Sequence, residues 1–221
     1  MISDNQIKIS FKHSSDQELL KRARQTLKAY KLRRSIREFS KKAVAKMVIE
    51  NIIMAASSAP SGAHKQPWTF CAISNSEIKS SIKKAAEKEE YDSYHGRMNE
   101  EWMGDLKVFE TNWEKPFLED APWLIVVFKQ SYGQGPIDEK KQHYYVNESV
   151  GIACGFLINA IHQAGLVTLT HPPSPMAFLS KILNRPENER PFLLFPVGYP
   201  KEITNVPNLT RKTKEEVIVW Y

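Results

Sequence analysis

The chain has 221 residues, of which 42% are hydrophobic and 25% are charged, and its formal net charge is +6. These values are ordinary for a globular protein with a full hydrophobic core, and the sequence contains no internal repeat or low-complexity segment. The excess of positive charge favours anionic ligands. Because no recognisable nucleic-acid-binding motif accompanies it, we expect no nucleic-acid partner.

The sequence also predicts neither a membrane-spanning segment nor a metal site. The longest uncharged apolar stretch, Ser149–Ile161, is too short to span a bilayer, and the first residues lack the apolar core of a signal peptide. The six histidines show no HxH or HExxH spacing. Cys71 and Cys154 lie outside any CxxC pair, and we expect both to be buried, reduced thiols. The sequence therefore predicts a soluble, cytoplasmic protein without a metal.

The elements in chain order alternate between helices and a few separated strands. Capping residues and apolar periodicity predict helices over 14–30, 41–57, 76–94, 145–164 and 178–183. The apolar runs "WTFCAIS", "WLIVVFK", "GLVTLT" and "FLLFPVGYP" predict strands, of which the second is apolar on both faces, as a central strand is. A polar segment over 96–119 carries no predicted element. The pattern indicates an α/β or α+β fold in one domain.

The helix around Ser149–Ile161 is apolar almost all round, and its glycines Gly151 and Gly155 are four residues apart. Such a helix is typical either of the centre of a monomer's core or of a subunit interface, where small residues allow close approach. The sequence leaves both alternatives open.

Two stretches stand out as candidate binding sites. "YKLRRSIREFS" (30–40) places three arginines around Ser35, which suits bidentate phosphate binding, but a solvated basic helix end has the same pattern. "SAPSGAHKQPW" (58–68) contains Pro60, Gly62 and Pro67, and its irregular backbone could present free N–H groups to a planar ligand or an anion. Alone, it is equally well a loop.

Together, the stretches resemble a known family. "RRSIREFS", "AASSAPSGAHKQPWTF", "GLVTLTHPPSP" and "PVGYP…NVPNLTRK" are similar to the FMN-dependent nitroreductase superfamily. Within it, "APSGAHKQPWTF" and "HYYVNESVGIACG" resemble the iodotyrosine deiodinase branch. The resemblance implies an α+β nitroreductase-like fold, with a central mixed sheet flanked by helices in an intertwined homodimer. It covers 30–221 as a single FMN-binding domain, with residues 1–29 as a helical extension and a substrate lid at about 88–116.

The resemblance also implies two FMN sites at the dimer interface, each built from both chains. Fixed cations there would suit the flavin phosphate and an anionic reduced ring. The cofactor-binding residues it implies are Arg33, Arg34, Ser35, Arg37, Pro60, Ser61, Gly62, Thr170, His171, Pro172 and Arg211. The reductant, either NAD(P)H directly or a separate reductase, stays undefined.

The substrate side carries over to four positions. In this branch a Glu, a Tyr and a Lys on the lid hold an amino-acid zwitterion, and they match Glu90, Tyr94 and Lys115. A carboxylate can pair with an ammonium, and a lysine with a tyrosine hydroxyl can bind a carboxylate. On sequence alone, "EKEEY" is more typical of a solvated helix face, and only the match at all three positions favours a substrate site. The backbone N–H of Ala63 is the expected donor to the substrate's phenolate.

One position departs from the branch. Deiodinases carry a Thr whose hydroxyl contacts the flavin N5, and this chain has Pro172 there, with neither a hydroxyl nor an N–H. Thr170 and His171 are the neighbouring candidates for the catalytic N5 region. The resemblance implies reductive dehalogenation of halotyrosines, 3-iodo-L-tyrosine to L-tyrosine and iodide. The alternative that Pro172 raises is a nitroreductase or flavin reductase that passes hydride to nitroaromatics or quinones.

Overall fold

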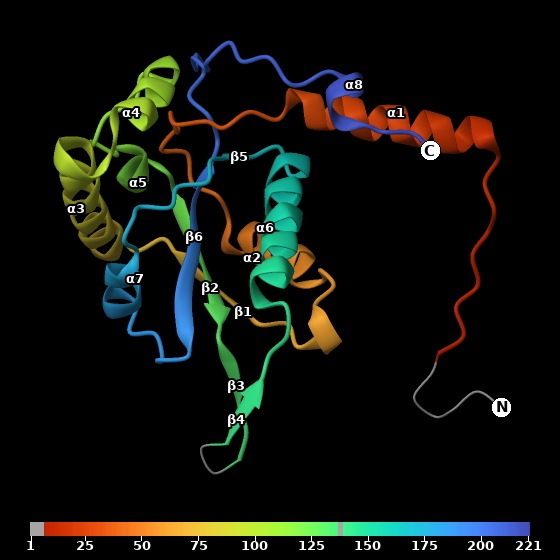
Figure 1. The fold of residues 1–221 in the computed structure, drawn as a ribbon, viewed down its shortest axis with the longest axis horizontal. Coiled ribbons are helices and arrows are strands. Elements are labelled where there is room, and N and C mark those ends of the chain that lie inside the picture. The colour runs from red at the N-terminus through yellow and green to blue at the C-terminus, as the bar shows by residue number, and fades with distance from the viewer. Residues whose placement is uncertain (1–6, 137–138) are drawn as a thin grey trace. The chain divides into compact units, whose positions relative to one another are not determined.

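The computed structural model describes residues 7–136 and 139–221 (Figure 1). These residues divide into two compact units, of which the first ends at Arg33 and the second begins at Arg34. The first unit contains α1 (Asp16–Leu32), as its capping residues predicted. Ser15 is the N-cap, and its side chain accepts a hydrogen bond from the Glu18 N–H. Four leucines of α1 are at least half exposed: Leu19, Leu20, Leu27 and Leu32. The helix therefore has an exposed apolar stripe.

The second unit is built on a four-stranded sheet of order β1-β2-β6-β5. Its strands are β1 (Trp68–Ile73), β2 (Trp123–Gln130), β5 (Val167–Thr168) and β6 (Glu189–Gly198). We expected a mixed sheet of parallel and antiparallel strands, but all three pairings between these strands are antiparallel. The parallel component among the described residues is one isolated bridge between Ser35 and Thr168. The strand predicted over 165–170 is shorter than expected, because Val167 and Thr168 are the residues that pair with β6. The chain then turns and forms an isolated bridge between His171 and Leu194.

The sheet is covered by helices on both faces (Figure 1). Helices α2 (Lys46–Ser57) and α6 (Val146–Gln163) pack on one face through a cluster that includes Ile125 and Val127 of β2. Helices α3 (Ser76–Asp92), α5 (Phe117–Asp120) and α7 (Ala177–Ile182) pack on the other through Leu124, Val126 and Phe128. Successive residues of β2 face opposite layers, which explains why this strand reads as continuously apolar.

The segment between α3 and α5 has more order than its polar composition suggested. A π-helix (Ser93–Arg97) follows α3 directly, and α4 (Glu100–Leu106) and a 3-10 turn (Lys107–Phe109) come next. Asn99 caps α4 by accepting the Trp102 N–H, a capping signal present in the sequence. The remaining elements are short: the 3-10 turn Gly62–His64, the antiparallel pair β3 (Tyr132–Gln134) and β4 (Lys140–Gln142), and α8 (Lys214–Val217).

Helix α6 has two different faces, which bears on both alternatives left open by its sequence. One face is buried in the monomer core, with Val150, Ala153, Leu157 and Ile161 fully covered. The other face exposes Ile152 and Phe156, each at 44%, together with both glycines. The helix is therefore a core element, and it also carries an apolar surface that nothing within the second unit covers.

Both cysteines are free, and Cys154 is buried, whereas Cys71 is half-buried rather than buried as expected. Within 7–136 and 139–221, no helix is long and apolar enough to cross a membrane.

Candidate functional site

A cavity of about 200 Å³ in the second unit lies where the segment between α3 and α5 meets the turn after β5. Seven residues that the sequence singled out line it: Arg37, Glu90, Tyr94, Lys115, Thr170, His171 and Pro172. They come from four separate stretches of the chain, over about 135 residues of sequence from 37 to 172. The fold therefore brings the expected flavin turn and the expected substrate residues to one place.

Backbone pairing explains why the arginine segment reaches this cavity. The N–H of Ile36 donates to the Thr168 carbonyl at 3.2 Å, and Ser35 forms the parallel bridge with the same residue. Two residues after Thr168, the chain exposes Thr170 and Pro172 while the His171 N–H donates to the Leu194 carbonyl at 2.9 Å. The "RRSIR" segment and the "THPP" turn are thus held side by side by the edge of the sheet.

The three residues expected at the substrate form one contact cluster. The Nζ atom of Lys115 lies 3.2 Å from Glu90 Oε2 and 5.3 Å from the centre of the Tyr94 ring. It also donates to the Asn112 carbonyl, and the Tyr94 hydroxyl donates to the Thr111 carbonyl at 3.4 Å. Glu90 lies in the last turn of α3 and Tyr94, four residues on, in the π-helix that continues it, and both face the cavity, as the sequence predicted.

Burial makes this cluster sensitive to charge. Lys115 is 3% exposed, and its burial lowers the pKa of its ammonium, an effect that Glu90 opposes. Burial likewise lowers the pKa of Arg37 and raises the pKa of Tyr94. Removing the partner of a charged group in this cluster would therefore leave a buried charge unpaired, which is costly in free energy.

His171 is buried beneath the turn that it belongs to. It is 7% exposed, its ring packs edge-on against Phe117 with centroids 5.3 Å apart, and its Nε2 atom is buried without a hydrogen-bond partner. Burial lowers the pKa of His171 to about 3, helped by the nearby charges of Lys115 and Arg37. The imidazole is therefore neutral at physiological pH and supports the turn from within, whereas Thr170 and Pro172 face outward.

This burial gives a prediction for stability against pH. The unfolded chain takes up a proton on His171 as the pH falls through 6.5, but the folded protein does so only near pH 3. Protons therefore favour the unfolded state, and the free energy of unfolding should fall as the pH drops from 6.5 toward 3. We expect His171→Leu to reduce this slope by up to ~1.4 kcal/mol per pH unit in urea unfolding. His13→Gln, at an exposed histidine of the first unit, should leave the slope unchanged, and an equal slope in His171→Leu would contradict the prediction.

The "PSG" loop lies elsewhere in the second unit. Pro60, Ser61, Gly62 and Ala63 do not line this cavity; instead the Gly62 N–H donates to the Ser149 hydroxyl at the start of α6, at 3.2 Å. Ala63 has φ of 48°, in the left-handed region, so the loop backbone is irregular as the sequence suggested. A Cβ on Gly62 would lie 2.7 Å from the Tyr144 carbonyl oxygen, which requires glycine there.

The basic residues of the expected phosphate site are distributed along the chain. Arg34 donates to the Pro207 carbonyl, which ties the "RRSIR" segment to the C-terminal stretch four residues before Arg211. Arg211 itself is exposed. Arg33 belongs to the first unit, where it is the C-cap of α1.

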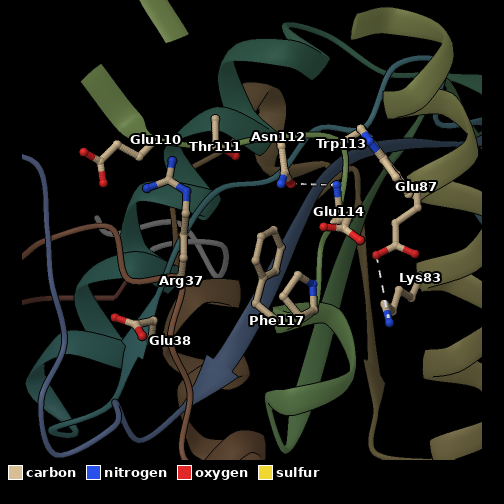
Figure 2. A pocket seen from close by; sticks show the side chains of 11 residues that line it. Arg37, Glu38, Lys83, Glu87, Glu110, Thr111, Asn112, Trp113, Glu114 and Phe117 are labelled. Atoms are coloured by element: carbon tan, nitrogen blue, oxygen red, sulfur yellow. Dashed lines mark hydrogen bonds and ion pairs between the residues drawn. The ribbon is translucent and has the colours of Figure 1, made fainter. Parts of the chain in front are cut away.

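A second, larger cavity of about 470 Å³ adjoins the first and shares Arg37, Thr111 and Phe117 with it (Figure 2). Its lining is mostly charged and includes Lys83 and Glu87 of α3. This cavity could not be predicted from the sequence, because it forms between α3 and the segment 96–119, for which no helix or strand was predicted.

Six further residues line the first cavity, and none of them was singled out in the sequence as a candidate site residue: Met98, Trp102, Leu106, Thr111, Phe117 and Leu169. A tryptophan within a strongly charged stretch was the one signal that could have pointed to Trp102. In the described part of the chain, no three His, Cys, Asp or Glu side chains lie together as a metal site would need.

Comparison with known proteins bears on this arrangement. The model described as "Nitroreductase family" matches residues 30–199. The iodotyrosine deiodinase of Haliscomenobacter hydrossis is 60% identical over 205 residues, 93% of this chain and 92% of that protein. The iodotyrosine deiodinase of Nematostella vectensis is 46% identical over 206 residues, 93% of this chain and 78% of that protein.

A solved structure is similar along most of its length. It is an oxidized iodotyrosine deiodinase bound to FMN and 3-iodo-L-tyrosine, with a TM-score of 0.75 and 29% sequence identity, and the match covers 88% of this chain and 97% of that one.

Proposed function

Because the chain belongs to the iodotyrosine deiodinase branch of the nitroreductase family, we propose that it is an FMN-dependent enzyme that removes iodide from 3-iodo-L-tyrosine. The observation that carries this proposal is the cluster of Glu90, Tyr94 and Lys115 beside the "THPP" turn in one cavity. A nitroreductase that acts on nitroaromatics does not need paired charges for a zwitterion at this position.

The residues present fit FMN by their chemistry. Arg34 and Arg37 are fixed cations, and Ser35 adds an exposed hydroxyl on the same segment. A guanidinium can bind a phosphate bidentately, and one beside the ring favours an anionic reduced flavin. We assign these three residues, with Arg33 and Arg211, to the phosphate and the polar edge of the ring, and Thr170–Pro172 to its N5 side.

The substrate cluster supports binding of a free amino acid. Glu90 and Lys115 carry opposite charges and lie 3.2 Å apart. A zwitterion brings one ammonium for Glu90 and one carboxylate for Lys115 and the Tyr94 hydroxyl, so the buried site stays neutral overall. A ligand with a single charge would leave one of the two protein charges unpaired.

When bound, FMN supplies two electrons from its reduced form. The substrate's carbon–iodine bond breaks, iodide leaves with its electron pair, and the ring carbon gains a proton, so 3-iodotyrosine, two electrons and one proton give tyrosine and iodide. The protein's residues hold the zwitterion and close the lid over the ring, which excludes water. We assign the Ala63 N–H as the donor to the phenolate oxygen, where a fixed backbone dipole stabilises negative charge.

The position of the "PSG" loop supports a homodimer. Pro60–Ala63 do not line the cavity of their own chain, and they sit against α6, whose outer face exposes Ile152 and Phe156. Pairing of two chains through this face would bring the loop of one chain to the cavity of the other. We therefore propose that each active site is completed by the partner subunit. Two free cysteines are consistent with a cytoplasmic location.

The test is binding and turnover by the purified protein with FMN. We expect 3-iodo-L-tyrosine to quench flavin fluorescence at micromolar concentrations, and the reduced protein to release iodide and tyrosine in equal amounts. Reduction of a nitroaromatic without iodide release would instead support the alternative reading of Pro172.

The side chain at 172 should set the balance between the two chemistries. Pro172 is exposed toward the cavity and can donate no hydrogen bond, whereas a threonine there can donate its hydroxyl. We expect Pro172→Thr to raise the rate of iodide release about tenfold, the value of one hydrogen bond to a charged group. It should also increase the one-electron form of the flavin in an anaerobic reductive titration with iodotyrosine bound. Pro172→Ala, which restores only the N–H, is the control; equal rates in all three proteins would remove residue 172 from the chemistry.

A further inference from the structure

The substrate cavity and the larger cavity share a thin wall. Thr111, Lys115 and Phe117 line the first, and Thr111–Glu114, Pro116 and Phe117 line the second. The segment 111–116 therefore lies between two cavities, and the packing of α5 against the core begins at Phe117. The stretch before Phe117 needs an attachment outside that core, and such an attachment helps to fix where Lys115 points.

Glu87 supplies that attachment. Its Oε1 atom accepts a hydrogen bond from the backbone N–H of Lys115 at 2.7 Å. One turn later on α3, Glu90 pairs with the Nζ atom of the same lysine. The two glutamates are three residues apart and lie on one face of the helix, so α3 holds Lys115 at its backbone and at its ammonium.

Glu87 is itself oriented by its neighbours. Lys83, one turn earlier, lies 3.9 Å from the Glu87 carboxylate and 2.9 Å from Glu119 of α5. Figure 2 shows Glu87 beside Lys83 and facing the segment that carries Asn112, Trp113 and Glu114. The side chain of Glu87 is 19% exposed, so its hydrogen bond to Lys115 is partly shielded from water.

We propose that Glu87 is a positioning residue for substrate recognition, which fixes the lid segment 111–117 so that Lys115 faces the carboxylate of the amino acid. This inference rests on the proposed function. Glu87 touches neither the cofactor nor the substrate in this role, and it acts through the backbone of Lys115. It should therefore matter for ligands that need Lys115 and not for ligands that lack a carboxylate.

The experiment compares two probes on the purified protein with bound FMN. Their dissociation constants are measured by quenching of flavin fluorescence: 3-iodo-L-tyrosine carries the zwitterion, and 2-iodophenol does not. We expect Glu87→Ala and Glu87→Met to weaken iodotyrosine binding about tenfold, because a charge-assisted hydrogen bond is lost. Binding of 2-iodophenol and the FMN content should change less than twofold. Methionine keeps the length and helix propensity of the side chain, so this variant guards against a loss of folding.

Two further variants sharpen the result. Glu87→Gln keeps an oxygen that can accept the Lys115 N–H, and it should bind iodotyrosine within about threefold of the unaltered protein. Glu77→Ala removes a glutamate from the first turn of the same helix and should bind both probes normally. If Glu87→Met weakens both probes equally, or weakens neither, the positioning role is wrong. If the unaltered protein itself fails to bind iodotyrosine, the proposed function fails first, and the two failures are distinguished.

Discussion

Replacing Phe156 by glutamate should separate the proposed dimer into monomers and abolish FMN binding. Phe156 is 44% exposed on the outer face of α6, next to Ile152 and the two exposed glycines. The substitution leaves the monomer core intact, since Val150, Ala153 and Leu157 occupy the opposite face. In a subunit interface, however, it would bury an unpaired carboxylate, which costs several kcal/mol.

Light scattering during size-exclusion chromatography measures the outcome, together with the flavin absorbance of the eluted protein. The unaltered protein should elute at twice its 25.4 kDa chain mass with FMN, and Phe156→Glu at one chain mass without it. Gln163→Glu adds the same charge at the exposed last residue of α6 and should remain a dimer. A monomer that keeps FMN would show that the site needs one chain only, and an unchanged dimer would place the interface elsewhere.

Glu90→Gln should weaken the binding of 3-iodo-L-tyrosine about 100-fold while leaving FMN bound. The substitution keeps the size of the side chain and removes its charge, so Lys115 is left buried without its ion-pair partner. The ammonium of the substrate also loses its carboxylate. Because both effects arise from charge and not from shape, the binding of 2-iodophenol should change less than threefold.

The measurement is a fluorescence-quenching titration, with Glu89→Gln as the matched control. Glu89 is the neighbouring glutamate and pairs at the surface with Arg97, outside the cavity. Its removal should alter the affinity less than threefold, as for an exposed ion pair. Equal affinity for iodotyrosine in Glu90→Gln and the unaltered protein would remove Glu90 from the substrate site.

Much of the fold could be read from the sequence. The apolar runs of β1, β2 and β6 and the helices α1, α3 and α6 were predicted close to their bounds, because their patterns are long and locally consistent. Helix α2 was predicted from residue 41 and begins later, at Lys46. Helix α4 was missed. It has seven residues, three of them charged and none buried, so it is too short for apolar periodicity, the signal used for the other helices, to show clearly.

The candidate site, like the fold, could be predicted only in part. Residue types and their order identified Arg37, Glu90, Tyr94, Lys115 and the 170–172 turn, but only by resemblance to a family. Spacing alone could not distinguish "EKEEY" from a solvated helix face. That distinction depends on Lys115, which is 25 residues from Glu90 in the chain and 3.2 Å from it in space.

Three features could be predicted before the fold was known: the class of fold, the segments that carry the candidate site and the missing hydroxyl at Pro172. These depend on local patterns and on the chemistry of single side chains. The folded chain was needed to show that His171 is buried and neutral, that the "PSG" loop does not line its own chain's cavity, and that Glu87 accepts a hydrogen bond from the backbone of Lys115. Each of these depends on burial or on contacts between distant segments, which the folded chain fixes and a local pattern does not contain.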